Sequence, residues 1–193
     1  MAPASLPPHT VASFDEDLQQ LRTNITRMGT LAAAQVLRAT DALLRMDSLA
    51  AGEVVAGDIE IDALQVVTER AVLEAIARNA PLAEDLRDML ATLHIATSLE
   101  RVGDYAKNIA KHVERCAALP QHGPAEKLAV LGERALALFQ DAMAAYVERD
   151  AGKAAAVVRG DDGVDAEYQR AFFALLAAAE ASALWCRRLF ISR

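Results

Sequence analysis

The sequence is poor in the residues that build sheets, aromatic cores and disulfide frameworks. Aromatic residues make up 5% of the 193 residues, beside 9 Gly, 6 Pro and 2 Cys. Ala and Leu dominate the apolar residues, which make up 53% of the chain, and this composition favours long, packed helices over a sheet. Cys116 and Cys186 have neither metal-type spacing nor a disulfide framework, so a reducing compartment is expected.

Positive charge is also scarce. The chain has 20 Lys and Arg against 27 Asp and Glu, a net charge of −7. Without a basic patch, such a surface repels phosphate backbones, so we expect no nucleic-acid partner. The N-terminus lacks the features of a signal peptide, and the alanine-rich run 171–185 is too short to span a bilayer. We therefore predict a cytoplasmic protein that does not insert into a membrane.

The common signatures of catalysis are missing. The sequence contains no glycine-rich phosphate loop, nucleophile elbow or Cys/His pair, so we predict that the protein is not an enzyme. One enzymatic alternative is a carboxylate-bridged metal oxidase or storage bundle, which needs Glu-x-x-His pairs. No Glu in this chain is followed three residues later by His, so this alternative is less favoured.

Apolar periodicity predicts an all-α fold. It indicates helices over 11–46, 58–80, 82–118 and 125–149, then one that starts within 151–165 and reaches 179, and a short terminal helix. The Pro- and Gly-containing segment 119–124 is the clearest boundary. We predict a first three-helix bundle over 1–120, in which 1–10 form a tail, and a second, incomplete helical unit over 121–193.

An internal repeat supports this division. "VVAGDIEIDA" (54–63) resembles "VVRGDDGVDA" (157–166), and the two copies are offset by 103 residues. Asp58 corresponds to Asp161 and Asp62 to Asp165. The repeat predicts two antiparallel three-helix bundles in tandem, the second incomplete at the C-terminus.

The third predicted helix carries acids away from its apolar stripe. Glu100, Asp104 and Asn108 lie roughly opposite the stripe, so burial does not explain them. The predicted stripe consists of Ile95, Leu99, Val102, Ala106, Ile109 and Val113.

The second and third helices, folded as a hairpin about Pro81, bring four carboxylates together. Asp58 then lies level with Asp104, and Asp62 level with Glu100. Four clustered carboxylates repel one another unless a cation joins them, and oxygen ligands suit hard cations and also iron. We predict a metal site here, and Gly103 would allow close approach of the neighbouring helix or the metal. The alternative is a solvated acidic face offset by lysines.

The segment 81–110 resembles the signature region of the PhoU family of phosphate-uptake regulators. The resemblance is carried by "DLR" (85–87) and "LERVGDYAKNIA" (99–110). The family pattern is a pair of E(D)-x-x-x-D motifs, matched here by Asp58–Asp62 and by Glu100–Asp104. The resemblance implies tandem three-helix bundles whose surface acids bind metal ions (iron, zinc, manganese, magnesium or calcium), with Asn108 as a ligand at the edge.

One feature departs from the family pattern. Asp161 and Asp165 would form half of a second metal site, but their partner motif would fall beyond Arg193. Relative to that pattern we expect the chain to be truncated at its C-terminus. Helices of the second unit would keep uncovered apolar faces, which predicts association with a second copy as a homodimer.

The resemblance also implies a function. It predicts a regulatory adaptor that binds the ATPase of a phosphate ABC transporter and a sensor histidine kinase, and so restrains the phosphate-starvation response. An accessory protein of a low-affinity phosphate carrier is the alternative.

Overall fold

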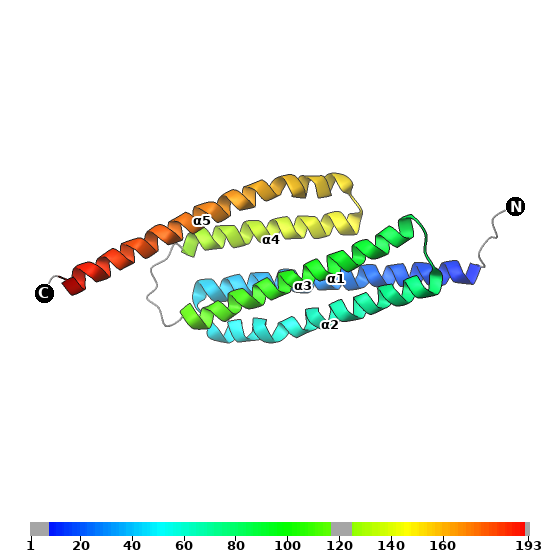
Figure 1. Ribbon diagram of the computed structural model, residues 1–193, viewed down its shortest axis with the longest axis horizontal. Helices are drawn as coiled ribbons and strands as arrows, with labels where there is room; N and C mark the ends of the chain where they lie inside the picture. The colour runs from blue at the N-terminus through cyan, green and yellow to red at the C-terminus, as the bar shows by residue number, and fades with distance from the viewer. Residues whose placement is uncertain (1–7, 117–124, 192–193) are drawn as a thin grey trace.

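The computed structural model describes residues 8–116 and 125–191, and the described residues form five helices and no strand. These helices are α1 (Pro8–Arg45), α2 (Ser48–Asn79), α3 (Glu84–Cys116), α4 (Ala125–Glu148) and α5 (Ala151–Ile191). The first three lie side by side, and α4 and α5 form a separate hairpin beside them (Figure 1). The predicted all-α fold is confirmed. None of these helices combines the length and the apolar character needed to cross a membrane.

Two predicted helix boundaries were wrong. α2 begins at Ser48 rather than near Asp58, because the Asp47 side chain accepts hydrogen bonds from the backbone N–H groups of Leu49 and Ala50 and so caps the helix early. α5 continues to Ile191 without the break predicted near Glu180. Its last part contains no Gly or Pro and is rich in Ala, so nothing in it stops a helix.

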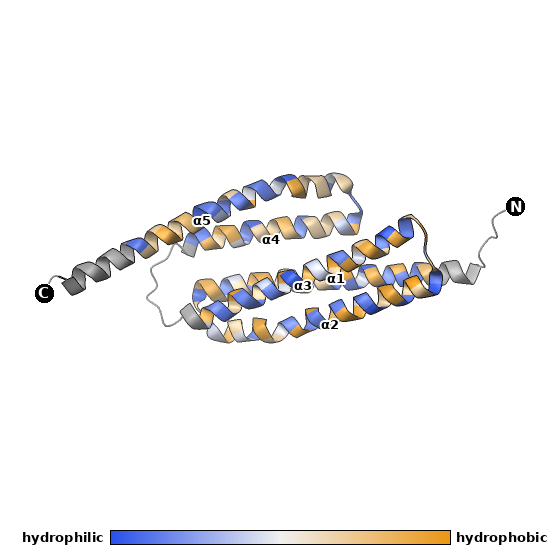
Figure 2. Ribbon diagram, in the orientation of Figure 1, coloured by the Kyte–Doolittle hydropathy of each residue, from blue (hydrophilic) through white to orange (hydrophobic). Residues whose placement is uncertain are grey.

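One end of the core of the first bundle is built largely from small residues. One layer is buried where the end of α1, the start of α2 and the end of α3 meet, and it consists of Ala39, Ala42, Ala51, Val54, Ala106, Ala110 and Val113. Two further layers, centred on Met28 and Leu21, continue along the bundle. Apolar and polar residues alternate along each helix in Figure 2, as expected where one face is buried.

The buried stripe of α3 is rotated from the predicted one. Leu99, Ala106 and Val113 are buried as predicted, whereas Ile95, Val102 and Ile109 lie half-buried at the edges. The remaining buried positions are Met89, Thr92, Ala96, Gly103 and Ala110. Three of these positions, Ala96, Gly103 and Ala110, carry small side chains, which let neighbouring helices approach closely.

The sequence repeat extends to the backbone. Met46 and Arg149 both adopt positive φ values, 52° and 54°. Asp47 N–H donates to the Ala42 carbonyl oxygen, and Asp150 N–H donates to that of Ala145. Each pair is related by the offset of 103, so the turns before α2 and α5 have the same design.

The contact between α1 and α4 has the same symmetry. Gly29 faces the Met143 side chain, and Gly132 faces that of Thr40. The offset of 103 converts one contact into the other, because it relates Gly29 to Gly132 and Thr40 to Met143. α1 and α4 therefore pack as an approximate two-fold pair, with a glycine on each helix making room for the partner's side chain.

Candidate metal centre

α2 and α3 bring the predicted acidic residues to one place between them. Lys107 links the two helices: its Nζ atom lies 3.2 Å from Asp104 Oδ1 and also pairs with Asp58 Oδ2. Asp58 and Asp104 therefore sit at the same level, as the predicted hairpin register requires. Of the four predicted ligands, Asp58 and Asp62 lie on neighbouring turns of α2. Glu100 and Asp104 lie on neighbouring turns of α3.

The other two acids belong to the same electrostatic cluster. Desolvation raises the pKa of Glu100, and the neighbouring carboxylates of Asp104, Asp62 and Asp58 raise it further. Desolvation and the Asp58 carboxylate raise the pKa of Asp62, whereas Lys107 lowers it. Both groups hold a proton more tightly than usual, chiefly because they are partly desolvated and in addition because neighbouring carboxylates repel their negative charge.

Asp58 is buried between the two helices, which was not predicted. Its side chain is only 3% exposed, and Lys107 is its counter-ion. Its other oxygen, Oδ1, is buried and has no hydrogen-bond partner among the described residues. Hydrogen bonds to Asp58 and then Asp104 raise the pKa of Lys107. A buried carboxylate is stable only beside a cation, and here the lysine ammonium supplies one.

Gly103 makes this arrangement possible. A Cβ atom at this position would lie 3.0 Å from Ile61 Cδ1 and 3.1 Å from Asp58 Oδ1. Both distances are tighter than ordinary van der Waals contact. The glycine therefore allows α2 to approach α3 and leaves room for the Asp58 carboxylate, which confirms the expected close approach.

The structure does not gather all predicted ligands equally. Glu100, Asp104 and Asp62 are half-exposed, and Asn108 is exposed on the next turn of α3. Asp161 and Asp165 are both exposed on α5, and no second pair of acids faces them within the described ranges 8–116 and 125–191. The predicted partial second site therefore consists of two acids one turn apart on α5.

The donor set fits a hard cation. All four groups are carboxylates, and Asp58 Oδ1 is a buried oxygen without a partner among the described residues. As the side chains stand, no set of three His, Cys, Asp or Glu residues within the described part of the chain is arranged to hold a metal ion. The Lys107 ammonium instead lies between Asp58 and Asp104. Metal binding stays a prediction.

The interhelical contact of Lys107 was not predicted. Only the alternative interpretation, a solvated acidic face, gave this residue a role, as one of two lysines that offset the acids. Its side chain is instead only 26% exposed and reaches across to α2. Its spacing of three residues from Asp104 identifies that contact from sequence alone. The contact with Asp58 depends on the interhelical distance, which sequence spacing does not contain.

Comparison with known proteins places these features in a family. Residues 25–113 match the PhoU domain. The chain is 40% identical over 168 residues to the phosphate-specific transport system accessory protein PhoU homolog of Zymomonas mobilis, a match that spans 87% of this chain and 71% of that protein. The chain belongs to the PhoU family. A relative of the same name from Caulobacter vibrioides is 41% identical over 172 residues, spanning 87% of this chain and 74% of the relative.

Solved PhoU structures share the fold. The crystal structure of PhoU from Pseudomonas aeruginosa superposes with a TM-score of 0.84 at 27% identity, covering 92% of this chain and 85% of that chain. The phosphate transport system regulatory protein PhoU from Streptococcus pneumoniae gives a TM-score of 0.75 at 27% identity, covering 82% and 74%. The helical arrangement of this chain is therefore that of the PhoU family.

Because Gly103 is needed for packing and Gly52 is not, substitutions at these two helical glycines should change the free energy of unfolding in opposite directions. Gly103→Val should lower the free energy of unfolding by about 2 kcal/mol, because the branched side chain would overpack against Ile61 and Asp58. Gly52→Ala is the control, since a Cβ there meets nothing within 4 Å. It should raise that free energy by about 1 kcal/mol through helix propensity. Chemical denaturation measures both, and a change of the same sign at both positions would contradict the packing argument.

The pairing of Lys107 with Asp58 predicts a second stability effect. In metal-free buffer, Lys107→Met should lower the free energy of unfolding by about 3 kcal/mol, because Asp58 would be left buried without a counter-ion. Adding Asp58→Asn should recover most of this loss. Lys111→Met, at an exposed position on the same helix, should change the stability by no more than about 0.5 kcal/mol. If the loss of stability in the double variant equals the sum of the losses in the two single variants, Lys107 and Asp58 do not stabilise each other, and the prediction is wrong.

Proposed function

We propose that this protein is an accessory protein of a phosphate transport system and acts by binding other proteins rather than by catalysis. The support is membership of the PhoU family, whose relatives from Zymomonas mobilis and Caulobacter vibrioides carry that name.

The proposed partners are the ATPase of a phosphate ABC transporter and a sensor histidine kinase. In this proposal the protein works in the cytoplasm, where it reports the state of the transporter to the kinase. Binding both partners when phosphate is plentiful would restrain the phosphate-starvation response. A rigid helical bundle is suited to this role, since its interface backbone needs little rearrangement on binding.

The proposed metal centre comprises Asp58, Asp62, Glu100 and Asp104. A divalent or ferric ion there would offset the mutual repulsion of the carboxylates, which together with desolvation raises the pKa of Asp62 and of Glu100. The observation that carries the proposal is the buried, unpartnered Asp58 Oδ1 within this acidic cluster. Asn108, one turn beyond Asp104, would contribute at the edge.

In this proposal Lys107 occupies the centre when no metal ion is bound. Its ammonium group contacts both Asp58 and Asp104, so a metal ion shared by those carboxylates would compete with it for the same oxygens. Lys107 has a long, flexible stem and is partly exposed, so it can move into solvent once a metal ion pairs with the carboxylates in its place. Metal binding would thus exchange one cation for another rather than create an isolated buried charge.

Elemental analysis tests the metal centre. After incubation with iron, zinc, manganese, magnesium or calcium and removal of free metal, the protein should retain at least one of these ions. The variant with Glu100→Ala and Asp104→Ala should lose it, because two of the four ligands are gone. The matched control, Asp161→Ala with Asp165→Ala on α5, should retain the same amount. Equal metal content in all three proteins, or none in any, would rule the centre out.

Affinity capture tests the role in phosphate control. The tagged protein, isolated from cells grown with ample phosphate, should retain the transporter ATPase and the sensor kinase identified by mass spectrometry. Deleting the gene should switch on phosphate-starvation genes in the same medium. Capture of neither partner, together with normal repression in the deletion strain, would refute this function.

A further inference from the structure

α2 carries an apolar stripe on the side that faces away from the core. The inner side of the helix is marked by four buried residues that recur at every seventh position, Val54, Ile61, Thr68 and Ala75. On the opposite side lies a series of exposed residues at alternating spacings of four and three. This outer stripe consists of Gly52, Ala56, Ile59, Ala63, Val66, Arg70, Leu73 and Ala77.

The outer stripe exposes large apolar side chains in the pattern of a helix-packing face. Ile59, Val66 and Leu73 are 73%, 53% and 62% exposed. Alternating spacings of three and four define the a and d positions along which one helix packs against another. The one charged member, Arg70, has a long aliphatic stem that can lie along such a surface while its guanidinium group stays in water. An apolar stripe of this length on an exposed face therefore marks a docking surface for a further helix.

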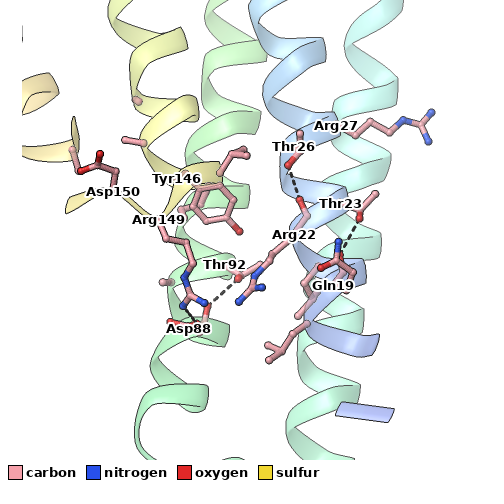
Figure 3. A pocket seen from close by; sticks show the side chains of 18 of the residues that line it. Gln19, Arg22, Thr23, Thr26, Arg27, Asp88, Thr92, Tyr146, Arg149 and Asp150 are labelled. Atoms are coloured by element: carbon pink, nitrogen blue, oxygen red, sulfur yellow. Dashed lines mark hydrogen bonds and ion pairs between the residues drawn. The ribbon is translucent and has the colours of Figure 1, made fainter. Parts of the chain in front are cut away.

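No helix of the second unit covers the outer stripe. Within the described ranges, the α2 backbone approaches α1 and α3 but neither α4 nor α5, and α2 lies on the far side of the first bundle from the α4–α5 hairpin (Figure 1). The large groove between that hairpin and the first bundle, seen in Figure 3, likewise has no lining residue from α2. The α3 backbone does not approach α5 either. The symmetry of the two units therefore places a third helix of the second unit beside α4 and α5 and away from α2.

The repeat shows that the outer stripe is specific to α2. The offset of 103 relates it to eight residues of α5, from Ala155 to Glu180. Four of these eight residues are polar or charged, namely Arg159, Asp162, Gln169 and Glu180. The corresponding residues of α2 are all apolar: Ala56, Ile59, Val66 and Ala77. Exposure at these positions is common to both helices, so the apolar character belongs to α2 and not to the repeat.

The outer stripe is bordered by acids on both sides. The acids are Glu53, Glu60 and Glu74 at the e positions of the heptad, and Asp62 and Glu69 at the g positions. Glu60 pairs with Arg27, whereas the other four acids form no ion pair with any residue that the structure describes. Both flanks of the stripe therefore carry unpaired negative charge.

We propose that the outer stripe of α2 binds an amphipathic helix of a partner protein whose flanks are basic. The apolar side of that helix would pack against Ile59, Val66 and Leu73, and its Lys or Arg residues would pair with the flanking acids. A second copy of this chain fits poorly, because two α2 helices in either orientation would bring acidic flanks together. The same acids repel a membrane surface made of anionic lipids.

A designed peptide tests the proposal on the full-length protein in metal-free buffer, so that the result does not depend on the metal centre. The probe is a fluorescent peptide of about four heptads with Leu at a and d, Lys at e and g, and Gln elsewhere. Fluorescence polarisation should show saturable binding. A second peptide with Glu in place of each Lys keeps the apolar stripe and should bind at least about tenfold more weakly, because its charges repel the flanking acids.

Paired variants of the protein locate the binding surface. Ile59→Gln with Val66→Gln makes the centre of the outer stripe polar without changing its charge. This variant should bind the Lys peptide at least about tenfold more weakly, because two apolar contacts are lost. The control is Val158→Gln with Phe173→Gln, which makes two exposed apolar residues of α5 polar in the same way and should leave binding unchanged. Circular dichroism checks that each variant keeps its helices.

Other results would overturn the proposal. Equal affinity for the two peptides, or binding of neither, would contradict a partner with basic flanks. Equal binding by the α2 and α5 variants would place the peptide elsewhere on the protein. A dimer, detected by light scattering, that the α2 variant dissociates and the α5 variant does not would assign the stripe to a second copy of this chain. Sedimentation of the protein with phosphatidylglycerol vesicles, lost only in the α2 variant, would assign the stripe to a membrane surface.

Discussion

The ion pair between Asp58 and Lys107 is the interaction on which the candidate site depends. A carboxylate this deeply buried between two helices requires a cation, and a helix must approach closely for that carboxylate to reach its partner across the interface. Gly103 provides the approach, and Lys107 provides the charge. Asp62, Glu100 and Asp104 then cluster around a position where negative charge exceeds positive charge. The same contacts that hold α2 against α3 thus gather the carboxylates of the proposed metal centre.

Much of the first bundle was predictable because helical geometry is regular. The equal rise per residue in two antiparallel helices was enough to put Asp58 level with Asp104 from their numbers alone. Apolar periodicity located the helices, although the early start of α2 depends on the Asp47 cap and was missed. The repeat at an offset of 103, found from two ten-residue segments, proved to extend to the turns and to the α1–α4 contact.

The parts that were not predictable depend on distances between helices. The sequence shows that Gly103 is unusual in a helix, but not that Asp58 is buried against it. The predicted stripe of α3 included Ile95, Val102 and Ile109, which are only half-buried. The small residues Ala96, Gly103 and Ala110 are buried instead, and small residues let two helices come close together.

The most direct test of the account is a crystal structure of the protein grown with manganese, recorded at a wavelength where manganese scatters anomalously. The account predicts an anomalous peak within bonding distance of Asp58 and Asp104, with Lys107 turned away from both carboxylates. A structure without a peak between α2 and α3, in which Lys107 still bridges the two carboxylates at millimolar manganese, would contradict it.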